Sequence, residues 1–331
     1  MPAMPLPAIG AAQARLPRCE IFAPPGPRMT STTQTHNAAT RPLDLSASAI
    51  VVFLCLCWGF NQVMVKFAMP DIPPMVQALI RSAGAALIIW CYARLRGISL
   101  DMRDETLRPG ILAGILFGLE FVFLYRGLLY TTVSRATLFV YTAPFVVVLG
   151  SYILVPGDRF RWQQWLGLAM SFAGLALAFG VPTPAADPNQ MLGDLLALLG
   201  GIAWGFTTLV VKSTSLARTG PEKTLQYQLV MSIPVLIAAV LIFGERIDHM
   251  PSAVALMSMT YKTLSVVALT FLIWFTMVLR YSASRLSAFT FLTPLFGVLA
   301  GSLVMGDPIT PAFVGAGVLV IGGLILVNRP K

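Results

Sequence analysis

The chain has 331 residues, of which 56% are hydrophobic and 11% are charged, and its net charge is +9 at pH 7. A soluble globular protein carries about a quarter charged residues to cover its surface. This composition therefore excludes a soluble globular protein. The basic residues are scattered among short polar segments, which excludes a basic surface for nucleic acid.

The apolar residues lie in blocks of about 20, the length at which a helix crosses the ~30 Å hydrocarbon core of a bilayer. The mean hydropathy is +0.77. The sequence therefore predicts an all-α polytopic membrane protein with ten transmembrane helices. The expected spans are 46–68, 74–95, 110–130, 133–155, 161–180, 191–212, 225–244, 262–281, 286–305 and 309–328.

Residues 1–45 precede the first expected span. They are rich in Pro, Ala and Thr and contain no apolar run of signal-peptide length. We expect a disordered N-terminal leader, with Met29 as an alternative initiator. The sequence leaves open whether residues 1–28 belong to the mature protein.

The Lys and Arg residues orient the expected spans, because cytoplasmic loops are enriched in basic residues. With a cytoplasmic N-terminus, 17 of the 23 basic residues lie on the cytoplasmic side, and one, Arg81, lies within a span. The five on the outside are Lys66, Arg126, Arg135, Arg246 and Lys262. We therefore expect a multi-pass protein of the cytoplasmic (inner) cell membrane with both termini in the cytoplasm.

A short pattern occurs twice in the chain. Trp58-Gly59-Phe60 precedes Lys66, and Trp204-Gly205-Phe206 precedes Lys212, 146 residues further on. Four more pairs recur at offsets of 148 to 150: Ser134-Arg135 with Ser284-Arg285, Pro144 with Pro294, Gly157-Asp158 with Gly306-Asp307, and Gly167 and Gly174 with Gly315 and Gly322.

These pairs predict two repeats of five spans each, at 46–180 and 191–328, joined by the Pro/Asp-containing loop 181–190. Five is an odd number, so the second repeat enters the membrane upside down. Inverted repeats are typical of carriers that work by alternating access, with the substrate held between the halves near the midplane.

In these features the sequence resembles the EamA family of the drug/metabolite transporter superfamily. The shared features are WG in the first span of each repeat, the Ser-to-Pro spacing in the fourth, and the Gly-acidic turn after it. The resemblance covers residues 46–328 and implies secondary transport, typically export, of amino acids or other small metabolites. The chain departs from the usual pattern in having Asp158 and Asp307 where many members have Glu, and in carrying Glu120 in span three.

Glu120 and Arg81 are the charged residues expected within the membrane. Glu120 lies about eleven residues into span three, where a charge costs ~2.5–3.5 kcal/mol and a carboxyl can exchange a proton near neutral pH. It is either a proton-coupling or cation-binding group or one half of a buried ion pair with Arg81. Arg81 is either the counter-charge for a substrate carboxylate or a side chain that extends to the outer interface.

Polar and aromatic residues beside the repeated pattern are further candidates for binding substrate. Amides and hydroxyls at this depth need partners and are expected to face the bundle interior. Helix packing is the alternative role for each of them. The candidates are Trp58, Asn61, Gln62, Tyr141, Trp204 and Thr207.

Pro144 and Pro294 occupy matched positions in the fourth and ninth spans and are expected to interrupt those helices. We interpret them as hinges, with a static kink as the alternative. Ser134 and Ser284 are expected N-caps of the helices that precede these prolines.

No metal site, disulfide framework or cofactor is predicted, because the four cysteines form no CxxC pair or Cys/His cluster and both histidines lie outside the expected spans. No paired acids or nucleophile motif occur at one depth, which argues against an enzyme.

The sequence therefore predicts a secondary transporter that exports small metabolites, such as amino acids or related amphipathic compounds, with proton coupling through Glu120. An uncoupled facilitator or exchanger, a multidrug efflux carrier and a non-transporting membrane receptor or scaffold are the alternatives. The expected partners are a small-molecule substrate and the lipid bilayer, without nucleic acid. Substrate identity, direction, coupling ion and the choice between monomer and homodimer stay open.

Overall fold

The structure is a computed structural model and describes residues 43–180, 188–306 and 309–329. The chain divides into two units, Met1–Asn37 and Ala38–Lys331, and every described residue belongs to the second. Nearly all of the expected leader and most of the expected loop 181–190 lie outside the described residues, as do Asp307 and Pro308.

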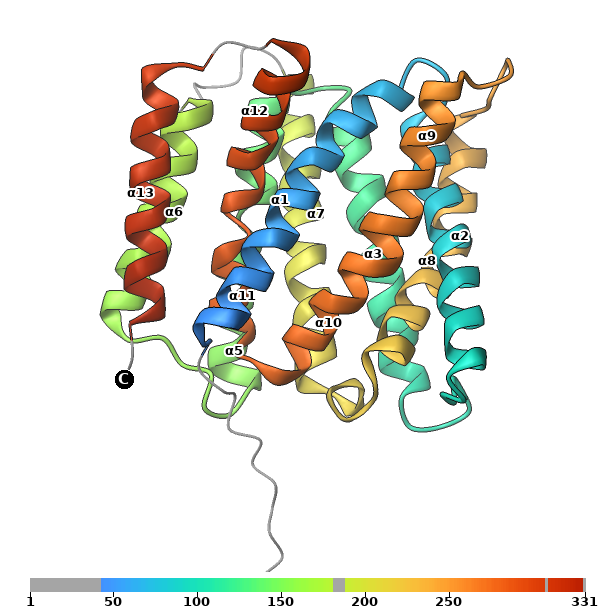
Figure 1. Ribbon diagram of the computed structural model, residues 1–331, viewed down its shortest axis with the longest axis horizontal. Helices are drawn as coiled ribbons and strands as arrows, with labels where there is room; N and C mark the ends of the chain where they lie inside the picture. Colours follow the sequence, from blue (N-terminus) through green and yellow to red (C-terminus); the bar gives the residue numbers. More distant parts are fainter. Residues whose placement is uncertain (1–42, 181–187, 307–308, 330–331) are drawn as a thin grey trace, which may run out of the picture. The chain divides into compact units, whose positions relative to one another are not determined.

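The described residues form helices and no strand (Figure 1). The α-helices are α1 (Leu45–Ala68), α2 (Pro74–Leu95), α3 (Leu107–Gly127), α4 (Val133–Val140), α5 (Ala143–Leu154), α6 (Trp162–Phe179), α7 (Pro188–Ser213), α8 (Pro221–Phe243), α9 (Ala253–Tyr261), α10 (Phe271–Arg280), α11 (Ala283–Phe289), α12 (Leu292–Met305) and α13 (Pro311–Asn328). A 3₁₀-helix, η1 (Ser215–Arg218), precedes α8, and a π-helix, η2 (Lys262–Thr270), joins α9 to α10.

Nine segments of the described chain are long and apolar enough to cross a membrane. Three of them combine shorter helices: α4 with α5, α9 through α10, and α11 with α12. The helix α6 covers the expected span 161–180 but is not among the nine, since it opens on the polar sequence Trp162-Gln163-Gln164-Trp165. A count of ten membrane-spanning helices is therefore not established.

Helix starts are fixed by short polar side chains that accept a hydrogen bond from the first helical turn. Asp44 accepts from the amide of Ala47 at 2.7 Å, and Ser252 accepts from that of Ala255 at 3.2 Å. The prediction that Ser134 and Ser284 are N-caps is wrong. The caps lie two residues earlier, at Thr132 and Ser282, which accept from the third amide of each helix.

One helix contact occurs twice, each time between the first helix of one expected repeat and the fourth span of the other. The helix α1 packs against α12, where a Cβ on Gly59 would lie 2.6 Å from the Cβ of Phe296, and only glycine permits this approach. The helix α7 packs against α5, where a Cβ on Gly205 would lie 2.7 Å from that of Val146. Gly205 follows Gly59 by 146 residues and Phe296 follows Val146 by 150, so the same contact is made by matched residues.

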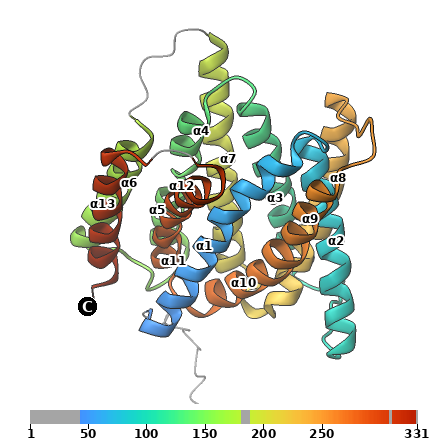
Figure 2. The ribbon, with the colours of Figure 1, turned by 45° about the horizontal axis from the view of Figure 1, so that its top comes forward.

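The helices α6 and α13 lie side by side at one edge of the described unit (Figures 1 and 2). The side-chain amide of Gln164, in the first turn of α6, donates to the carbonyl of Val327 near the end of α13 at 2.7 Å. Ser171, two turns further along α6, donates to the carbonyl of Val320 at 3.4 Å. The two helices therefore run antiparallel over most of their length.

Lys212 near the end of α7 and Asp158 after α5 bind backbone and side-chain groups at the start of α11 and the end of α10. The Lys212 ammonium donates to the carbonyls of Val278, Leu279 and Tyr281 at 2.7, 3.3 and 2.9 Å and so caps the end of α10. The Asp158 carboxylate accepts from the Ser282 hydroxyl at 2.5 Å and from the Ser284 amide at 3.2 Å. Every residue of α11, which follows, is buried.

The repeat-related groups at the other end differ. Lys66, the counterpart of Lys212, is exposed, and its ammonium makes no hydrogen bond within the described part of the chain. Val133, the first residue of α4, is 64% exposed, whereas its counterpart Ala283 in α11 is fully buried. The repeated sequence pattern therefore makes different contacts at the two ends.

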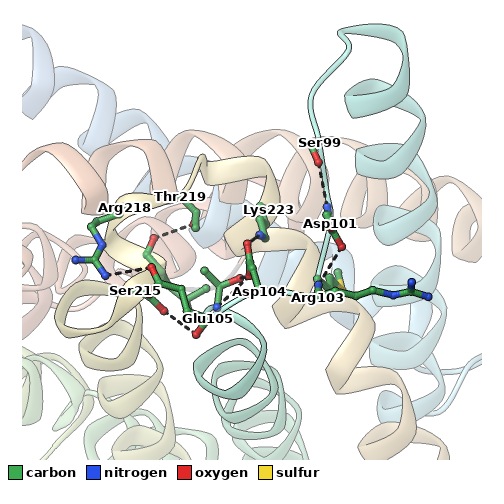
Figure 3. A network of polar contacts seen from close by, with 12 residues as sticks. Ser99, Asp101, Arg103, Asp104, Glu105, Ser215, Arg218, Thr219 and Lys223 are labelled. Atoms are coloured by element: carbon green, nitrogen blue, oxygen red, sulfur yellow. Dashed lines mark hydrogen bonds and ion pairs between the residues drawn. The ribbon is translucent and has the colours of Figure 1, made fainter.

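A polar network at the lower end joins the loop before α3 to η1 and α8 (Figure 3). Asp104 accepts from the Lys223 ammonium at 2.5 Å and from the Thr106 amide at 3.0 Å. Glu105 pairs with Arg218 at 3.2 Å on the exposed surface. The hydrogen bonds from Lys223 and Thr106 lower the pKa of Asp104 to about 2.

We expect Asp104→Asn to lower the melting temperature of the purified protein at about pH 7 and to have little effect in strong acid. The folded pKa lies below the ordinary value of about 3.9, so the charged carboxylate stabilises the fold above about pH 4, and that contribution is lost as pH falls toward about 2. Thermal unfolding of both proteins across this range measures the difference.

Glu105→Gln is the matched control, because the Glu105–Arg218 pair is exposed and such pairs contribute little. A melting-temperature difference for Asp104→Asn that stays constant from neutral pH to about pH 2 would contradict this account.

Candidate functional site

Arg81 is a buried cation on α2. Its side chain is 4% exposed, and its guanidinium carbon lies 4.0 Å from the centroid of the Phe121 ring on α3. Its Nε and Nη2 atoms are buried without a hydrogen-bond partner. The alternative in which Arg81 extends to the outer interface is therefore wrong for this conformation.

Glu120 is half-buried on α3, one residue before Phe121. Arg81 lies close enough for its charge to act on this carboxyl. Within the described residues, however, neither a hydrogen bond nor an ion pair joins the Glu120 carboxylate to another side chain. The expected alternative of a closed ion pair with Arg81 is not formed, and Arg81 stacks on Phe121 instead.

Both residues lie at similar distances from the end of the bundle where α2 begins and α3 ends. Arg81 is seven residues from the start of α2 and Glu120 is seven residues before the end of α3. At 1.5 Å per residue, each is about 10 Å from that end. The structure ends α3 at Gly127, three residues before the end of the expected span 110–130, so Glu120 lies nearer this end than the sequence indicated.

Lys262 is a third charged group in this region and corrects the sequence prediction. It was expected at the outer surface, but the span begins at Ala253, nine residues earlier, and the Lys262 side chain is fully buried. Its ammonium donates to Oε1 of Gln77 on α2, whose amide nitrogen donates in turn to the carbonyl of Ile72 at 2.7 Å. The charge of Arg81 acts on Lys262 as well as on Glu120.

The sequence misplaced Lys262 because its charge was taken as the edge of an apolar block, although residues 253–261 before it are also apolar. The signal that could have located the true start is Ser252, which follows a proline and has the character of an N-cap. Lys262 also begins the π-helix η2. Such helices are rare and are frequent at functional sites.

Trp58 connects the first copy of the repeated pattern to this cluster. Its indole N–H donates to the Thr270 hydroxyl at the end of η2 at 2.8 Å. The indole packs edge-on against Phe271 and Trp274, with centroids 5.8 and 5.3 Å apart. Phe271 contacts Phe117, which packs against the Phe121 ring beneath Arg81.

Tyr141 and Trp204 form a second aromatic group at the interrupted spans. Tyr141 lies directly after α4, and its ring packs edge-on against Trp204 of α7 at 5.7 Å. The same ring lies 6.1 Å from that of Phe291, between α11 and α12. Trp204 thus lies where the two broken spans meet, and it is not part of the charged cluster.

Three predicted residues do not join either group. The Thr207 hydroxyl donates to the carbonyl of Ala203 in its own helix at 2.8 Å. Gln62 is exposed, and its side chain lies beside Gly297 of α12. Asn61 is half-buried with an unpartnered Oδ1 atom. Binding roles for Gln62 and Asn61 stay predictions.

Pro144 and Pro294 lie where their spans are interrupted. Pro144 is the second residue of α5, after a break at 141–142, and Pro294 is the third of α12, after a break at 290–291. Both helices restart at the proline because its fixed φ suits a first turn. The interruptions are present as expected; their role as hinges stays a prediction.

No group of three or more His, Cys, Asp or Glu side chains in the described residues could hold a metal ion. The chemistry available in the charged cluster is that of two cations, one carboxyl and an amide beside aromatic rings. Such a set can bind an anion or a zwitterion and can exchange a proton at Glu120.

Several known proteins similar to this chain are described as transporters of bacteria or archaea. The uncharacterized transporter YoaV of Bacillus subtilis is 24% identical, over 83% of this chain and 94% of the relative. The uncharacterized inner membrane transporter YedA of Escherichia coli K12 is 23% identical, over 84% and 89%. A protein of Salmonella typhimurium described as a probable amino-acid metabolite efflux pump is 22% identical, over 84% and 93%.

A solved crystal structure of a protein superposes with a TM-score of 0.71 at 19% identity and covers 85% of this chain and 96% of the other. At that identity the likeness concerns the fold alone. The EamA-like transporter family matches residues 45–180 and 191–329. Together with the membrane-spanning helices, this match identifies the chain as a multi-pass membrane protein that belongs to the EamA-like transporter family.

Proposed function

We propose that the protein is a secondary transporter that exports small metabolites, such as amino acids or related amphipathic compounds, and that couples export to protons through Glu120. The observation that carries the proposal is the Glu120 carboxyl about 10 Å inside the helices, beside a buried guanidinium with which it makes no ion pair. The relative described as an amino-acid metabolite efflux pump supports the substrate class.

The proposed architecture has ten spans in two inverted repeats, 46–180 and 191–328, with both termini in the cytoplasm. The helix α6 is the tenth span, since it runs antiparallel beside α13 over most of its length. The matched contacts of Gly59 and Gly205 support the two repeats. In this arrangement the breaks before Pro144 and Pro294 are the hinges, and the protein resides in the cytoplasmic membrane.

The charged cluster supports coupling more than a purely structural role for Glu120. A carboxylate held in a closed ion pair would have to lose that pair before it could take up a proton. Here the Arg81 guanidinium stacks on Phe121, and its charge reaches the carboxyl without a direct hydrogen bond. The carboxyl can therefore exchange a proton without breaking a salt bridge, as a coupling group must.

Export can be tested in cells that express the protein and are challenged with toxic amino-acid analogues and cationic drugs. We expect resistance to one or more amino-acid analogues, which identifies both substrate class and direction. Resistance confined to cationic drugs would indicate a multidrug carrier instead. Resistance to nothing across the panel, with the protein shown to be present in the membrane, would contradict export.

A further inference from the structure

The helices around Glu120 hold more positive than negative charge. Arg81 is 4% exposed and Lys262 is fully buried, on α2 and η2. Across α2, α3, η2 and α10, Glu120 is the only acidic residue. Arg81 lies close enough for its charge to act on both the Glu120 carboxyl and Lys262. Two buried positive charges and one carboxyl leave a net positive charge, which is costly in a low-dielectric interior unless a counter-ion is present.

Both cations also have unused hydrogen-bonding capacity. The Nε and Nη2 atoms of Arg81 are buried without a partner. The Lys262 ammonium has three N–H donors and, among the described residues, a single acceptor, Gln77. The nearby acid Glu245 accepts from the amide of Met75 in the first turn of α2 at 2.9 Å. No carboxylate of the described chain therefore completes the shell of either cation.

Arg81 lies on the face of α2 that contacts η2, the helix that carries Lys262. Gln77, Arg81 and Gly84 follow one another at helical spacing and share a face of α2. Gln77 contacts Lys262, and Gly84 lies so close to Thr263 that a Cβ would be 2.8 Å from its methyl group. Arg81 thus lies between two points where α2 touches η2.

We propose that Arg81 and Lys262 together bind the carboxylate of the transported molecule, so that the substrates are small acids with Glu120 facing their other charged or polar end. This proposal rests on the proposed function and names the substrate class of that site. The planar guanidinium offers paired N–H donors that match a carboxylate, and the ammonium adds a point charge. An α-amino acid fits because its ammonium can meet Glu120 while its carboxylate meets the two cations.

The test is acid-dependent thermal stabilisation of the purified protein in phosphatidylcholine nanodiscs. The panel pairs each proteinogenic L-amino acid with its amide and adds acetate, lactate and inorganic phosphate. We expect one or more free acids to raise the melting temperature, and the matching amides to have no effect. A second set of nanodiscs that contain phosphatidylglycerol distinguishes a lipid headgroup as the anion, since that lipid would stabilise the protein without added acid.

Three variants test whether Arg81 and Lys262 bind the acid, and a fourth variant is the control. Arg81→Gln is expected to weaken acid binding by about tenfold or more, because truncating one partner of a buried charge pair costs at least that much. Lys262→Gln is expected to weaken it in the same direction, and Arg81→Lys to retain part of it. Arg126→Gln is the matched control: its guanidinium also lies 4.0 Å above a phenylalanine ring, that of Phe243, but at the end of α3. It is expected to bind acids as the wild type does.

Equal stabilisation by acids and amides, no acid-dependent stabilisation across the panel, or wild-type acid affinity in Arg81→Gln would each overturn the proposal. Stabilisation that needs only the anionic lipid would overturn it as well and assign the cations to a headgroup. The measurement uses no gradient, so acid binding without export would refute the proposed function and leave this inference standing.

Discussion

Replacing Glu120 with glutamine is expected to abolish the pH dependence of transport in proteoliposomes. Glutamine keeps the size and the hydrogen-bonding ends of the side chain but has no proton to exchange. The titratable groups near this position are Arg81 from α2, Tyr125 one turn away on α3, and Tyr141 after α4; Lys262 of η2 lies beyond Arg81. The measurement is the initial rate of substrate movement after a pH jump, in either direction, for wild type and variant.

We expect wild-type rates to follow the imposed proton gradient and Glu120→Gln rates to be the same with and without it. Glu105→Gln is the control, since Glu105 lies at the surface in an exposed pair with Arg218. Transport in Glu120→Gln that still responds to the gradient as the wild type does would refute coupling at this residue. Gradient-independent transport by the wild type itself would identify an uncoupled facilitator or exchanger.

Gly201→Ala is expected to destabilise the protein by about 1–3 kcal/mol, the usual cost of overpacking a close contact. A Cβ at Gly201 on α7 would lie 2.5 Å from the carbonyl oxygen of Val140 and 3.0 Å from that of Phe139. These are the last residues of α4, directly before the interruption at Pro144. The added methyl would push α7 away from the break, which is measurable as a lower melting temperature in detergent.

Gly317→Ala provides the matched control in the middle of α13, because a Cβ there would meet nothing within 4 Å. Alanine favours the helix over glycine by about 1 kcal/mol, so this variant is expected to match or exceed the wild type. If Gly201→Ala and Gly317→Ala have the same melting temperature, the close approach of α7 to the break contributes nothing to stability.

Much of this fold could be predicted from the sequence because long apolar blocks and duplicated residues carry strong signals. The spans of α1 and α2 agree with the expected ranges within a residue or two. The interrupted spans follow from Pro144 and Pro294, since proline cannot continue a helix. Arg81 and Glu120 could be identified from the sequence because a charge within an apolar membrane span is energetically costly and is usually functional.

What the sequence missed depends on tertiary contacts. Lys262 is charged, so the sequence places it at the outer edge of a span, whereas the structure buries it against Gln77 of α2. The π-helix η2 has no sequence signature of its own.

The two repeat-related lysines, Lys66 and Lys212, differ in their backbone contacts. Lys212 holds the carbonyls of Val278, Leu279 and Tyr281, whereas Lys66 holds none in the described chain. At the offset that relates the fourth and ninth spans, the matching carbonyls are those of Leu128, Leu129 and Thr131. If the two ends of the molecule exchanged roles, the hydrogen bonds broken at one end would be of the same kind as those made at the other. A single sequence pattern, used twice, would then make both states nearly equal in free energy, which a cycle driven by thermal motion and a modest gradient requires.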